Sequence, residues 1–395
     1  MSKKTALFDP KKFLNLYGLD ELERLRLERN PFWNRIRFET TWQLPVMAEI
    51  TEHSNIELIP MRLATREELG LFHDPSYIET IELFGNQGTA FASRFGLDTE
   101  SCPVFPQMDQ YSNYIVGSAI DAIMGVASGK YKNAFSFFGG LHHALESKAG
   151  GFCYYNDCVI AIKKYREEYP NKKVLYLDTD VHHGDGTQHA FYDDPNVMTI
   201  SVHELSMGFY PGTGRAEEIG SGDGEGYNAN IPLPPLTDDH EYWRVFEDVI
   251  VPLWLTYSPD FVFWDVGADA HMLDPLADLM LTNDTYNRMS KTVRQLVELS
   301  DGKLAVVGGG GYNPVSTAKI WTMVLADIAR VPLPSTLPAE WIRLCQDFDL
   351  EIKRGGWTDR PFRTEEETFV NIHRAVTDSI SKVQDLLFPI HGIEK

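Results

Sequence analysis

LYLDTDVHHGDG, at residues 175–186, is the stretch of this sequence that says most about the fold. The apolar run at 173–177 is typical of a strand buried on both faces, and ionisable residues follow it directly. Alternate side chains of an extended segment share one face, so we expect Asp178, Asp180 and His182 to lie together. Ligands of open α/β sheets bind beyond the carboxyl ends of the strands, which makes these residues a candidate site.

Four other runs of β-branched or aromatic residues also end in glycine or polar residues, at 134–138, 197–202, 261–266 and 304–307. Segments with helical spacing of apolar residues alternate with them, at 114–128, 157–167, 242–257, 284–299 and 314–329. This order predicts an α/β fold with a mainly parallel β-sheet and helices on both faces. No linker or repeat divides the chain. We therefore expect a single domain over 1–395, with core motifs at 134–315, a C-terminal helical region at 336–390 and a last helix at 365–387.

The composition is that of an acidic protein. Asp and Glu number 57 against 36 Lys and Arg, and the formal charge of −21 repels a phosphate backbone and attracts cationic substrates, or simply keeps the surface soluble. Four cysteines without a C-x-x-C pair indicate a reducing compartment. The sequence shows neither a signal-peptide pattern nor an apolar run of the ~20 residues that a membrane span needs. We expect a cytoplasmic protein that binds neither nucleic acid nor membranes, and the oligomeric state stays open.

A metal ion explains the acidic cluster after the strand at 173–177. Buried carboxylates repel each other, so a group of Asp178, Asp180 and His182 is costly unless a cation binds there. A third ligand must come from another strand end, and Asp269 is the best placed; Asp265 competes, but we expect it within the strand. Asp180, His182 and Asp269 then supply two oxygens and one nitrogen, and an open position is left for water. This set suits catalytic zinc, and the ligand types do not exclude iron, manganese or cobalt.

The tandem His142-His143 follows the strand at 134–138 and brings two imidazoles to the same edge of the sheet. A neutral histidine can take a proton from attacking water, and a protonated partner can stabilise an oxyanion or protonate a leaving amine. Asp178 and Asp185 are the carboxylates available to set the tautomers and pKa values of the pair.

The glycine-rich run GGGGY, Gly308–Tyr312, lacks the lysine of a phosphate-binding loop and ends in a phenol. We expect Tyr312 to donate a hydrogen bond to a substrate carbonyl opposite the metal. Gly151 and Phe152, with Tyr210 from the run MGFYPGTG, can form an apolar slot for a narrow chain.

Six motifs follow one another between about Phe137 and Asn313: GGLHHA, GGFCYYND, LYLDTDVHHGDGTQHAF, FYPGTG, GADAHMLDP and GGGGYN. As a set they resemble the zinc-dependent histone deacetylase family, in its arginase-like fold, and within it the class I and bacterial acetoin-utilisation branch. Helical flanks on both sides extend the similarity to nearly the whole chain.

The resemblance implies a role for each matching residue. It makes Asp180, His182 and Asp269 the metal ligands, His142 and His143 the general base and electrostatic pair, and Asp178 and Asp185 their carboxylate partners. Tyr312 matches the tyrosine that polarises the carbonyl. The tunnel residues are Gly151 as a backbone acceptor, Phe152 and Tyr210 as walls, Leu276 at the rim and Arg37 below the metal.

The resemblance also implies one or two structural potassium ions. The first site uses Asp178, Asp180, His182, Ser201 and Val202, partly through backbone carbonyls. The second uses Phe191, Asp194, Val197 and Tyr227.

Two residues depart from the family pattern. Relatives usually carry an aspartate that grips the substrate backbone where this chain has Ser101, preceded by Glu100. Tyr210 stands where phenylalanine is usual, which adds a hydroxyl to the tunnel wall. The first departure leaves both an acyl-lysine peptide and a small acylated amine open as substrates.

The sequence therefore predicts a metal-dependent amidohydrolase that removes acetyl or other short acyl groups from acetyl-lysine side chains or from small amines such as acetylpolyamines. Zinc is the expected metal, and Fe²⁺ is an alternative. An arginase-like ureohydrolase has the same fold but needs two manganese ions and more carboxylate ligands. A third hypothesis is a protein that binds acylated amines without turnover.

Overall fold

A parallel β-sheet forms the centre of the molecule. The computed structural model describes residues 3–15, 27, 29–87, 92–352, 356–359 and 365–395. In this part of the chain eight strands form one sheet, in the order β2-β1-β3-β8-β7-β4-β5-β6, and all neighbours pair in parallel. The strands are β1 (Thr5–Asp9), β2 (Ile56–Pro60), β3 (Asn133–Ser136), β4 (Val174–Asp178), β5 (Val197–Glu204), β6 (Asn228–Leu233), β7 (Phe261–Asp265) and β8 (Lys303–Val307).

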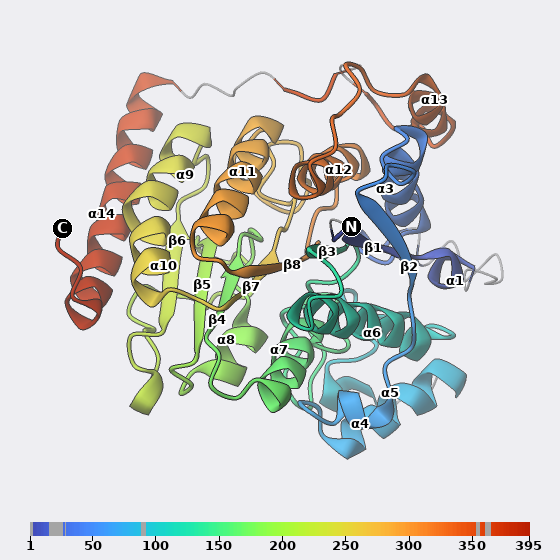
Figure 1. Cartoon of the computed structure of the whole chain (residues 1–395), viewed down its shortest axis with the longest axis horizontal. Coiled ribbons are helices and arrows are strands. Elements are labelled where there is room, and N and C mark those ends of the chain that lie inside the picture. Colours follow the sequence, from blue (N-terminus) through green and yellow to red (C-terminus); the bar gives the residue numbers. More distant parts are fainter. Residues whose placement is uncertain (1–2, 16–26, 28, 88–91, 353–355, 360–364) are drawn as a thin grey trace.

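Helices cover both faces of the sheet (Figure 1). On one side α6 (Met108–Ala127) packs against α7 (Asp157–Glu168), which contacts α8 (Asp185–Phe191). On the other side α12 (Pro314–Ala329) contacts α3 (Arg35–Met47) and α11 (Asn283–Leu299). Further helices are α1 (Lys11–Leu14), α4 (Arg66–Leu69), α5 (Pro75–Gln87), α9 (Asp239–Val245), α10 (Val251–Tyr257), α13 (Ala339–Asp347) and α14 (Glu366–His391), with 3-10 turns at Ala92–Phe95 and Gly222–Gly224.

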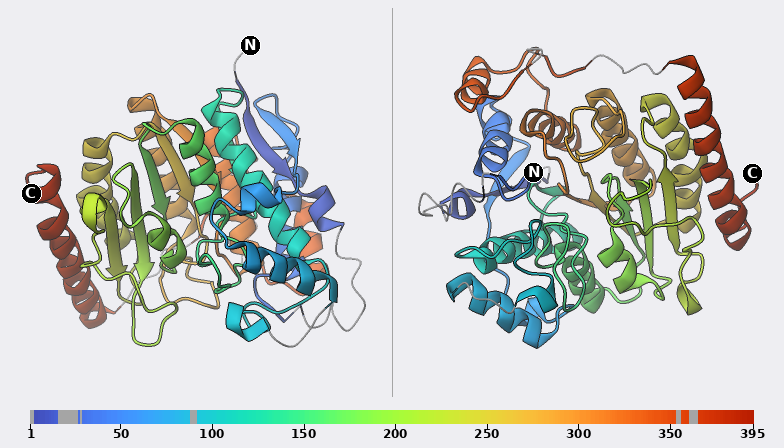
Figure 2. Two further views of the ribbon diagram at one scale, coloured as in Figure 1. Left: turned by 90° about the horizontal axis from the view of Figure 1, so that it is seen from below. Right: turned by 180° about the vertical axis from the view of Figure 1, so that it is seen from behind.

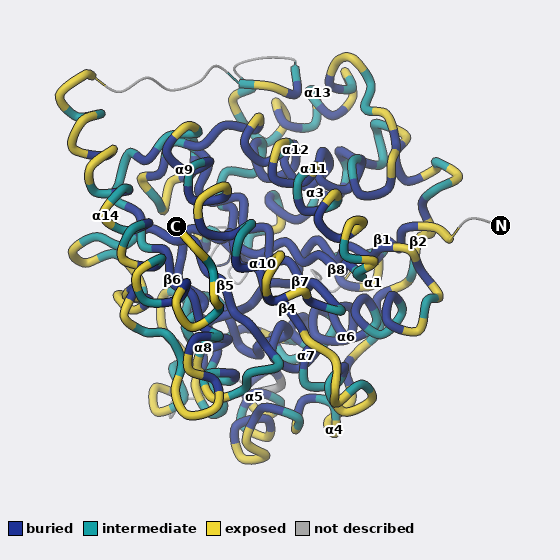
Figure 3. Tube along the Cα trace, turned by 60° about the vertical axis from the view of Figure 1, so that its left-hand side comes forward, coloured by how far each residue is buried: buried dark blue, intermediate teal, exposed yellow. Residues whose placement is uncertain are grey.

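The central strands are buried on both faces, as the dark core of Figure 3 shows. Every residue of β4, β5 and β7 is buried. Strands that are covered by helices on both faces need nearly continuous apolar sequence, which is why VLYLD and FVFWD do not alternate. The predicted single α/β domain with a parallel sheet is confirmed.

Three strands were absent from the sequence prediction. β2 (IELIP) is an edge strand with only one residue fully buried, so it lacks the apolar run of a central strand. β6 (NANIPL) lies at the other edge and contains Pro232, which edge strands tolerate. β1 (TALFD) has only three consecutive apolar residues, Ala6–Phe8. At the β6 edge of the sheet, α14 packs against β6, α9 and α10 (Figure 2).

The helix predicted at 242–257 begins earlier and is not uniform. α9 leads into a π-helical turn at Phe246–Ile250 and then into α10, whose first turn accommodates Pro252. The predicted last helix at 365–387 corresponds to α14. Among the described helices, none is both long enough and apolar enough to cross a bilayer.

Candidate metal centre and active site

The candidate site lies where four neighbouring strands end. β3, β8, β7 and β4 are adjacent, and their last residues pair in register: Ser136 with Val307, Val307 with Asp265, and Asp265 with Asp178. The loops that follow these strands comprise residues 137–143, 308–312, 266–269 and 179–185. Parallel strands bring their carboxyl ends to one edge, so these four distant segments meet there.

Asp180, His182 and Asp269 form a cluster of possible metal ligands. One atom of each lies within 4.8 Å of the others, and all three side chains are buried. Nδ1 of His182 lies 3.2 Å from Oδ1 of Asp180 and 3.1 Å from Oδ2 of Asp269. The structure thus brings together the three residues that the sequence analysis selected as ligands.

Backbone N–H groups orient both carboxylates of this cluster. Asp180 accepts hydrogen bonds from the N–H of Gly310 at 2.6 Å and from the N–H of His182 at 2.9 Å. Asp269 accepts from the N–H of Val181 at 2.9 Å. A Cβ atom on Gly310 would lie 2.0 Å from Oδ2 of Asp269, so this close approach requires glycine.

The donor set and its charges fit a divalent cation. Burial, followed by the negative charge of Asp180, raises the pKa of Asp269 to about 6. Burial opposes protonation of His182, but hydrogen bonds to Asp180 and Asp269 raise its pKa to about 10. Two carboxylates and an imidazole that converge on one buried point form a donor set that suits a hydrolytic metal ion with open coordination positions.

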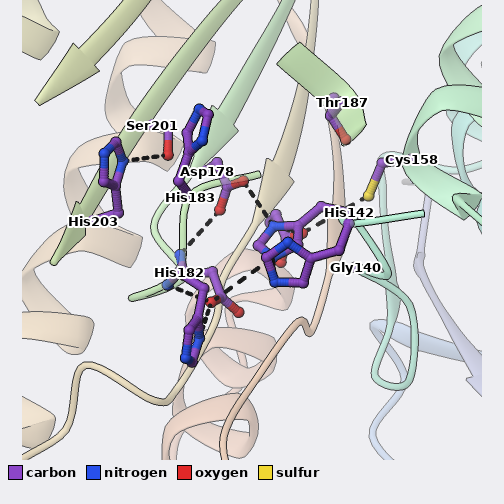
Figure 4. Close-up of polar contacts among 12 residues, drawn as sticks. Gly140, His142, Cys158, Asp178, His182, His183, Thr187, Ser201 and His203 are labelled. Atoms are coloured by element: carbon purple, nitrogen blue, oxygen red, sulfur yellow. Dashed lines mark hydrogen bonds and ion pairs between the residues drawn. The ribbon is translucent and has the colours of Figure 1, made fainter. Parts of the chain in front are cut away.

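His142 and His143 are each paired with a carboxylate. Nδ1 of His142 lies 2.9 Å from Oδ2 of Asp178 (Figure 4), and Nδ1 of His143 lies 2.7 Å from Oδ1 of Asp185. The two Nε2 atoms face each other at 3.1 Å. Both rings are buried. The carboxylates therefore fix the ring orientations and place a proton on each Nδ1.

The two imidazoles differ in protonation. Burial opposes the charged form of His142, but the charges of Asp178 and Asp180 raise its pKa well above the ordinary value. Burial, followed by the positive charge of His142, lowers the pKa of His143 to about 4. At neutral pH His142 is therefore protonated, and His143 is the neutral member that can accept a proton.

Asp178 lies beside His142 and outside the ligand cluster, which differs from the alternation expected from the sequence. β4 ends at Asp178 and the chain bends after it, so the alternation of an extended strand does not continue to His182. Oδ1 of Asp178 accepts the N–H of Asp180 at 3.1 Å, which links the two groups through the backbone.

Asp265 is the last residue of β7, within the strand as expected, and is not part of the ligand cluster. Its Oδ2 lies 3.7 Å from Nδ1 of His142. The hydroxyl of Tyr176 lies 3.0 Å from Asp265 and 3.1 Å from Asp178. Asp265 therefore acts as a second carboxyl group behind His142, a position that the sequence analysis did not assign.

Asn156 and Asp157 hold the backbone of the histidine pair. The Nδ2 group of Asn156 donates to the carbonyl oxygen of His142 at 3.0 Å. Asp157 accepts from the N–H groups of Gly140 at 3.1 Å and Leu141 at 2.7 Å. Both side chains are fully buried. The sequence analysis quoted them within GGFCYYND but gave them no role, although two polar residues at the start of an apolar helix are a usable signal.

Tyr312 follows the glycine run and faces the ligand cluster. The centroid of its ring lies 6.2 Å from that of His182 and 5.5 Å from that of Phe152. Burial, followed by the charge of Asp269, raises its pKa well above the ordinary value, so the hydroxyl stays protonated and can donate.

Gly151 and Tyr210 lie against the ring of His143, and Phe152 directly follows Gly151 in the chain. The ring of Tyr210 packs edge-on against His143, with centroids 4.9 Å apart. A Cβ atom on Gly151 would lie 2.2 Å from Cδ2 of His143, so the wall approaches this ring closely only because residue 151 is glycine. Phe152 stacks on Phe32 at 5.9 Å. The structure therefore brings together the three residues that we expected to form an apolar slot.

A surface pocket of about 960 Å³ opens beside Phe152. Its lining includes Ser101, Leu276, Asp98, Glu100 and Arg29. Leu276 is 37% exposed, which is compatible with a rim position. The two predicted rim residues therefore share one opening with two carboxylates and one arginine.

Arg37 is buried beneath the glycine run. It donates to the carbonyl oxygens of Gly311 at 2.6 Å and Gly309 at 3.0 Å, and its guanidinium lies 4.4 Å from the ring centroid of Phe32. Arg37 therefore supports the backbone that leads to Tyr312.

The residues of the two predicted potassium sites lie on or near β4 and β5. Asp178 and Ser201 are register partners, and Val202 follows on β5. Around the second site, the N–H of Asp194 bonds to the carbonyl of Phe191, the N–H of Val197 to that of Asp194, and the N–H of Thr199 to that of Tyr227, at 3.1, 3.2 and 3.0 Å. Both potassium sites stay predictions.

The fold and the site together define a class, the metal-dependent hydrolases built on a parallel α/β sheet. Comparison with known proteins narrows this class. The model of the histone deacetylase domain matches residues 33–328. Acetoin utilization protein AcuC of Bacillus subtilis is 36% identical over 323 residues, 80% of this chain and 81% of that protein. AcuC of Staphylococcus xylosus is 34% identical over 360 residues, 90% and 91% of the two chains.

A solved structure agrees with these relatives. The crystal structure of an HDAC homolog complexed with SAHA has a TM-score of 0.83 and 28% identity, and the match covers 97% of this chain and 100% of that one. The chain therefore belongs to the histone deacetylase family and is a metal-dependent deacetylase with the deacetylase/arginase fold. The family predicted from the six motifs is confirmed.

Proposed function

We propose that this deacetylase removes acetyl or other short acyl groups from amines with a zinc ion held by Asp180, His182 and Asp269. One observation carries the proposal: the rings of His143 and Tyr312 flank the ligand cluster, with centroids 6.1 and 6.2 Å from that of His182. A zinc ion bound there would polarise the amide carbonyl and lower the pKa of a water molecule. Fe²⁺ suits the same ligands.

His143 is the general base of the proposed reaction. It is neutral at pH 7, and Asp185 engages its Nδ1, so its Nε2 is the atom that takes a proton from the attacking water. The same atom then returns the proton to the leaving amine. The protonated His142, 3.1 Å away, stabilises negative charge at the reaction centre.

Tyr312 supports the carbonyl oxygen with its phenol group. Its hydroxyl keeps its proton because burial and the nearby carboxylates disfavour the phenolate. It therefore donates a hydrogen bond that strengthens as the carbonyl oxygen becomes an oxyanion. Cleavage yields a carboxylic acid, acetate in the simplest case, and a free amine.

The proposed substrates are acylated amines, either acetyl-lysine side chains or small acetylated polyamines, whose remaining amines are cationic. Phe152 and Tyr210 form an apolar wall suited to a narrow alkyl chain, with Gly151 as a backbone acceptor. Asp98 and Glu100 at the opening favour a positively charged remainder of the substrate. Ser101 offers a hydroxyl where relatives usually carry a carboxylate, which favours small amines over peptides.

The proposal also includes structural potassium ions and the cellular compartment of the enzyme. Potassium ions bound near Ser201 and Val202, and near Asp194 and Tyr227, would hold β5 against the ligand loop. The net charge of −21 supports an enzyme that does not bind nucleic acid, and the four free cysteines support a reducing, cytoplasmic setting.

A substrate panel tests the proposed function. Acetyl-lysine peptides, acetylated polyamines and longer acyl analogues are incubated with the zinc-loaded protein, with and without a chelator, and the released acid is measured. We expect release that the chelator abolishes. Urea release with two manganese ions per chain would identify a ureohydrolase, and binding of every substrate without turnover would identify a binding protein.

A further inference from the structure

Asp274 is a buried carboxylate that joins two loops of the site. It lies on the segment that follows Asp269 and is 8% exposed. Its Oδ2 accepts the backbone N–H of Tyr312 at 2.7 Å. Its Oδ1 accepts the backbone N–H of Leu276 at 3.0 Å. One side chain thus connects the loop that carries the phenol to the segment at the opening of the pocket.

Contacts from outside the glycine run hold its backbone: Arg37 donates to the carbonyl oxygens of Gly309 and Gly311, and Asp180 accepts the N–H of Gly310. Gly309 and Gly311 have φ values of 78° and 128°, and a run of glycines has many other backbone conformations of similar energy. The run therefore depends on such contacts, and Asp274 extends them to the N–H of Tyr312 itself.

Asn313, the residue after Tyr312, is held in place by several hydrogen bonds. The Oδ1 atom of Asn313 accepts the N–H groups of Val315 at 3.1 Å and Ser316 at 3.0 Å and so caps α12. Its Nδ2 group donates to the carbonyl of Leu273 at 3.1 Å, next to Asp274. Asn313 thus anchors the chain directly after Tyr312, and Asp274 anchors the backbone N–H of Tyr312.

The position of a hydrogen-bond donor in an active site has a large effect on turnover. A displacement of about 1 Å can cost roughly 100-fold in rate, because the donor must meet the oxygen where charge develops. The hydroxyl of Tyr312 moves with its backbone, since the side chain is only partly buried and its ring packs against Phe152 and His182.

We propose that Asp274 is a positioning residue that places the Tyr312 hydroxyl through its backbone N–H and ties this placement to the Leu276 rim. The proposal rests on the role of Tyr312 in the proposed function. Asp274 does not touch the substrate, so its effect passes through Tyr312 and falls on kcat more than on KM.

A double-mutant cycle tests this coupling. Asp274→Asn keeps the shape but replaces one acceptor oxygen by an amide N–H₂, which cannot accept from the three backbone N–H groups, those of Leu276, Tyr312 and Asn313, that bond to this side chain. We expect Asp274→Asn to lower kcat at least about 10-fold in the parent, with KM within about twofold and one metal per chain. In the Tyr312→Phe background, which has no hydroxyl to place, the same change should lower kcat less than about twofold.

Two variants control for charge and folding. Asp278→Asn makes the same Asp-to-Asn change at an exposed position four residues further on, and it should leave kcat unchanged. Asp274→Glu keeps both acceptor oxygens and should recover part of the lost kcat. An equal fall of kcat in both backgrounds, or no fall in the parent, would overturn the proposal.

Amide hydrogen exchange separates this proposal from the proposed function. The Tyr312 amide should exchange faster in Asp274→Asn than in the parent, while amides in the middle of α12 stay unchanged. This readout needs no substrate, so it holds even if no acylated amine is turned over, in which case the proposed function alone fails. Unchanged exchange at Tyr312 would refute the anchoring role of Asp274.

Discussion

Asp178 and Asp265 are register partners at the ends of β4 and β7, and both carboxyl groups are fully buried beside His142. Burial raises the pKa of both groups. Asp178 keeps its charge because His142 and the N–H of Asp180 stabilise it. Asp265 holds the proton, since the charge of Asp178 disfavours a second anion and its Oδ1 has no hydrogen-bond partner in the described part of the chain.

Because Asp178 is charged and Asp265 is neutral, we expect Asp178→Asn and Asp265→Asn to lower kcat by different amounts. Asp178→Asn removes the anion that orients and charges His142, so we expect kcat to fall about 10- to 100-fold with the metal retained. Asp265→Asn replaces a neutral acid by a neutral amide of the same shape, so kcat should stay within about threefold. Steady-state kinetics and metal content measure both, and a loss in Asp265→Asn as large as that in Asp178→Asn would show the assignment to be wrong.

Tyr312→Phe should lower kcat by about 100-fold, because it removes the hydrogen bond to the developing oxyanion. The ring contacts with Phe152 and His182 stay, so metal content and melting temperature should be those of the parent. Kinetics with one acetylated substrate measure the effect. The same kcat in variant and parent would remove Tyr312 from the proposed reaction.

The sequence predicted the parts of the fold whose pattern is local. β4, β7 and β8 are continuous apolar runs that end in polar or glycine residues, so both the strands and the edge of the sheet that carries the site could be predicted. The edge strands β2 and β6 could not, because partial exposure and Pro232 remove the apolar run.

The site residues could be predicted where they lie in the loop that directly continues a predicted strand. They could not be predicted where the contact depends on packing between two loops. Asp269 and His143 belong to the first kind. The position of Asp178 depended on where β4 ends, which sequence alternation does not show. The hydrogen bonds of Asp274 to Tyr312 join residues 38 apart in the chain, and no local pattern encodes them.

His73 makes the stability of the fold sensitive to acid. It is buried, its Nε2 accepts the N–H of Asn156 at 3.0 Å, and burial lowers its pKa to about 4. Between pH 6.5 and pH 4 the unfolded chain binds a proton at this residue and the folded chain does not. The free energy of unfolding should therefore fall by about 2 kcal/mol from this group between pH 7 and pH 5.

Urea unfolding of the parent and of His73→Gln at these two pH values measures this effect. The variant lacks the titrating imidazole, so its free energy of unfolding should fall by about 2 kcal/mol less than that of the parent. Equal losses in the two proteins would contradict the role of His73.

Ser101 should decide between peptide and small-amine substrates. A carboxylate at this position can accept N–H groups of a peptide backbone, so Ser101→Asp should lower KM for an acetyl-lysine peptide about 3- to 10-fold and leave KM for an acetylated diamine within about twofold. Thr99→Asp adds the same charge to the lining of the same pocket and serves as the control. A similar change in KM in both variants would assign the effect to charge alone.

A zinc titration of the metal-free protein, with acetate release from one acetylated amine as the readout, tests the central claim most directly. We predict that activity rises linearly to one zinc ion per chain and then stays constant. Asp180→Ala, which lacks one of the three ligands, should neither bind zinc in this range nor release acetate. Full activity in the metal-free protein, or a rise that continues to two ions per chain, would contradict the account.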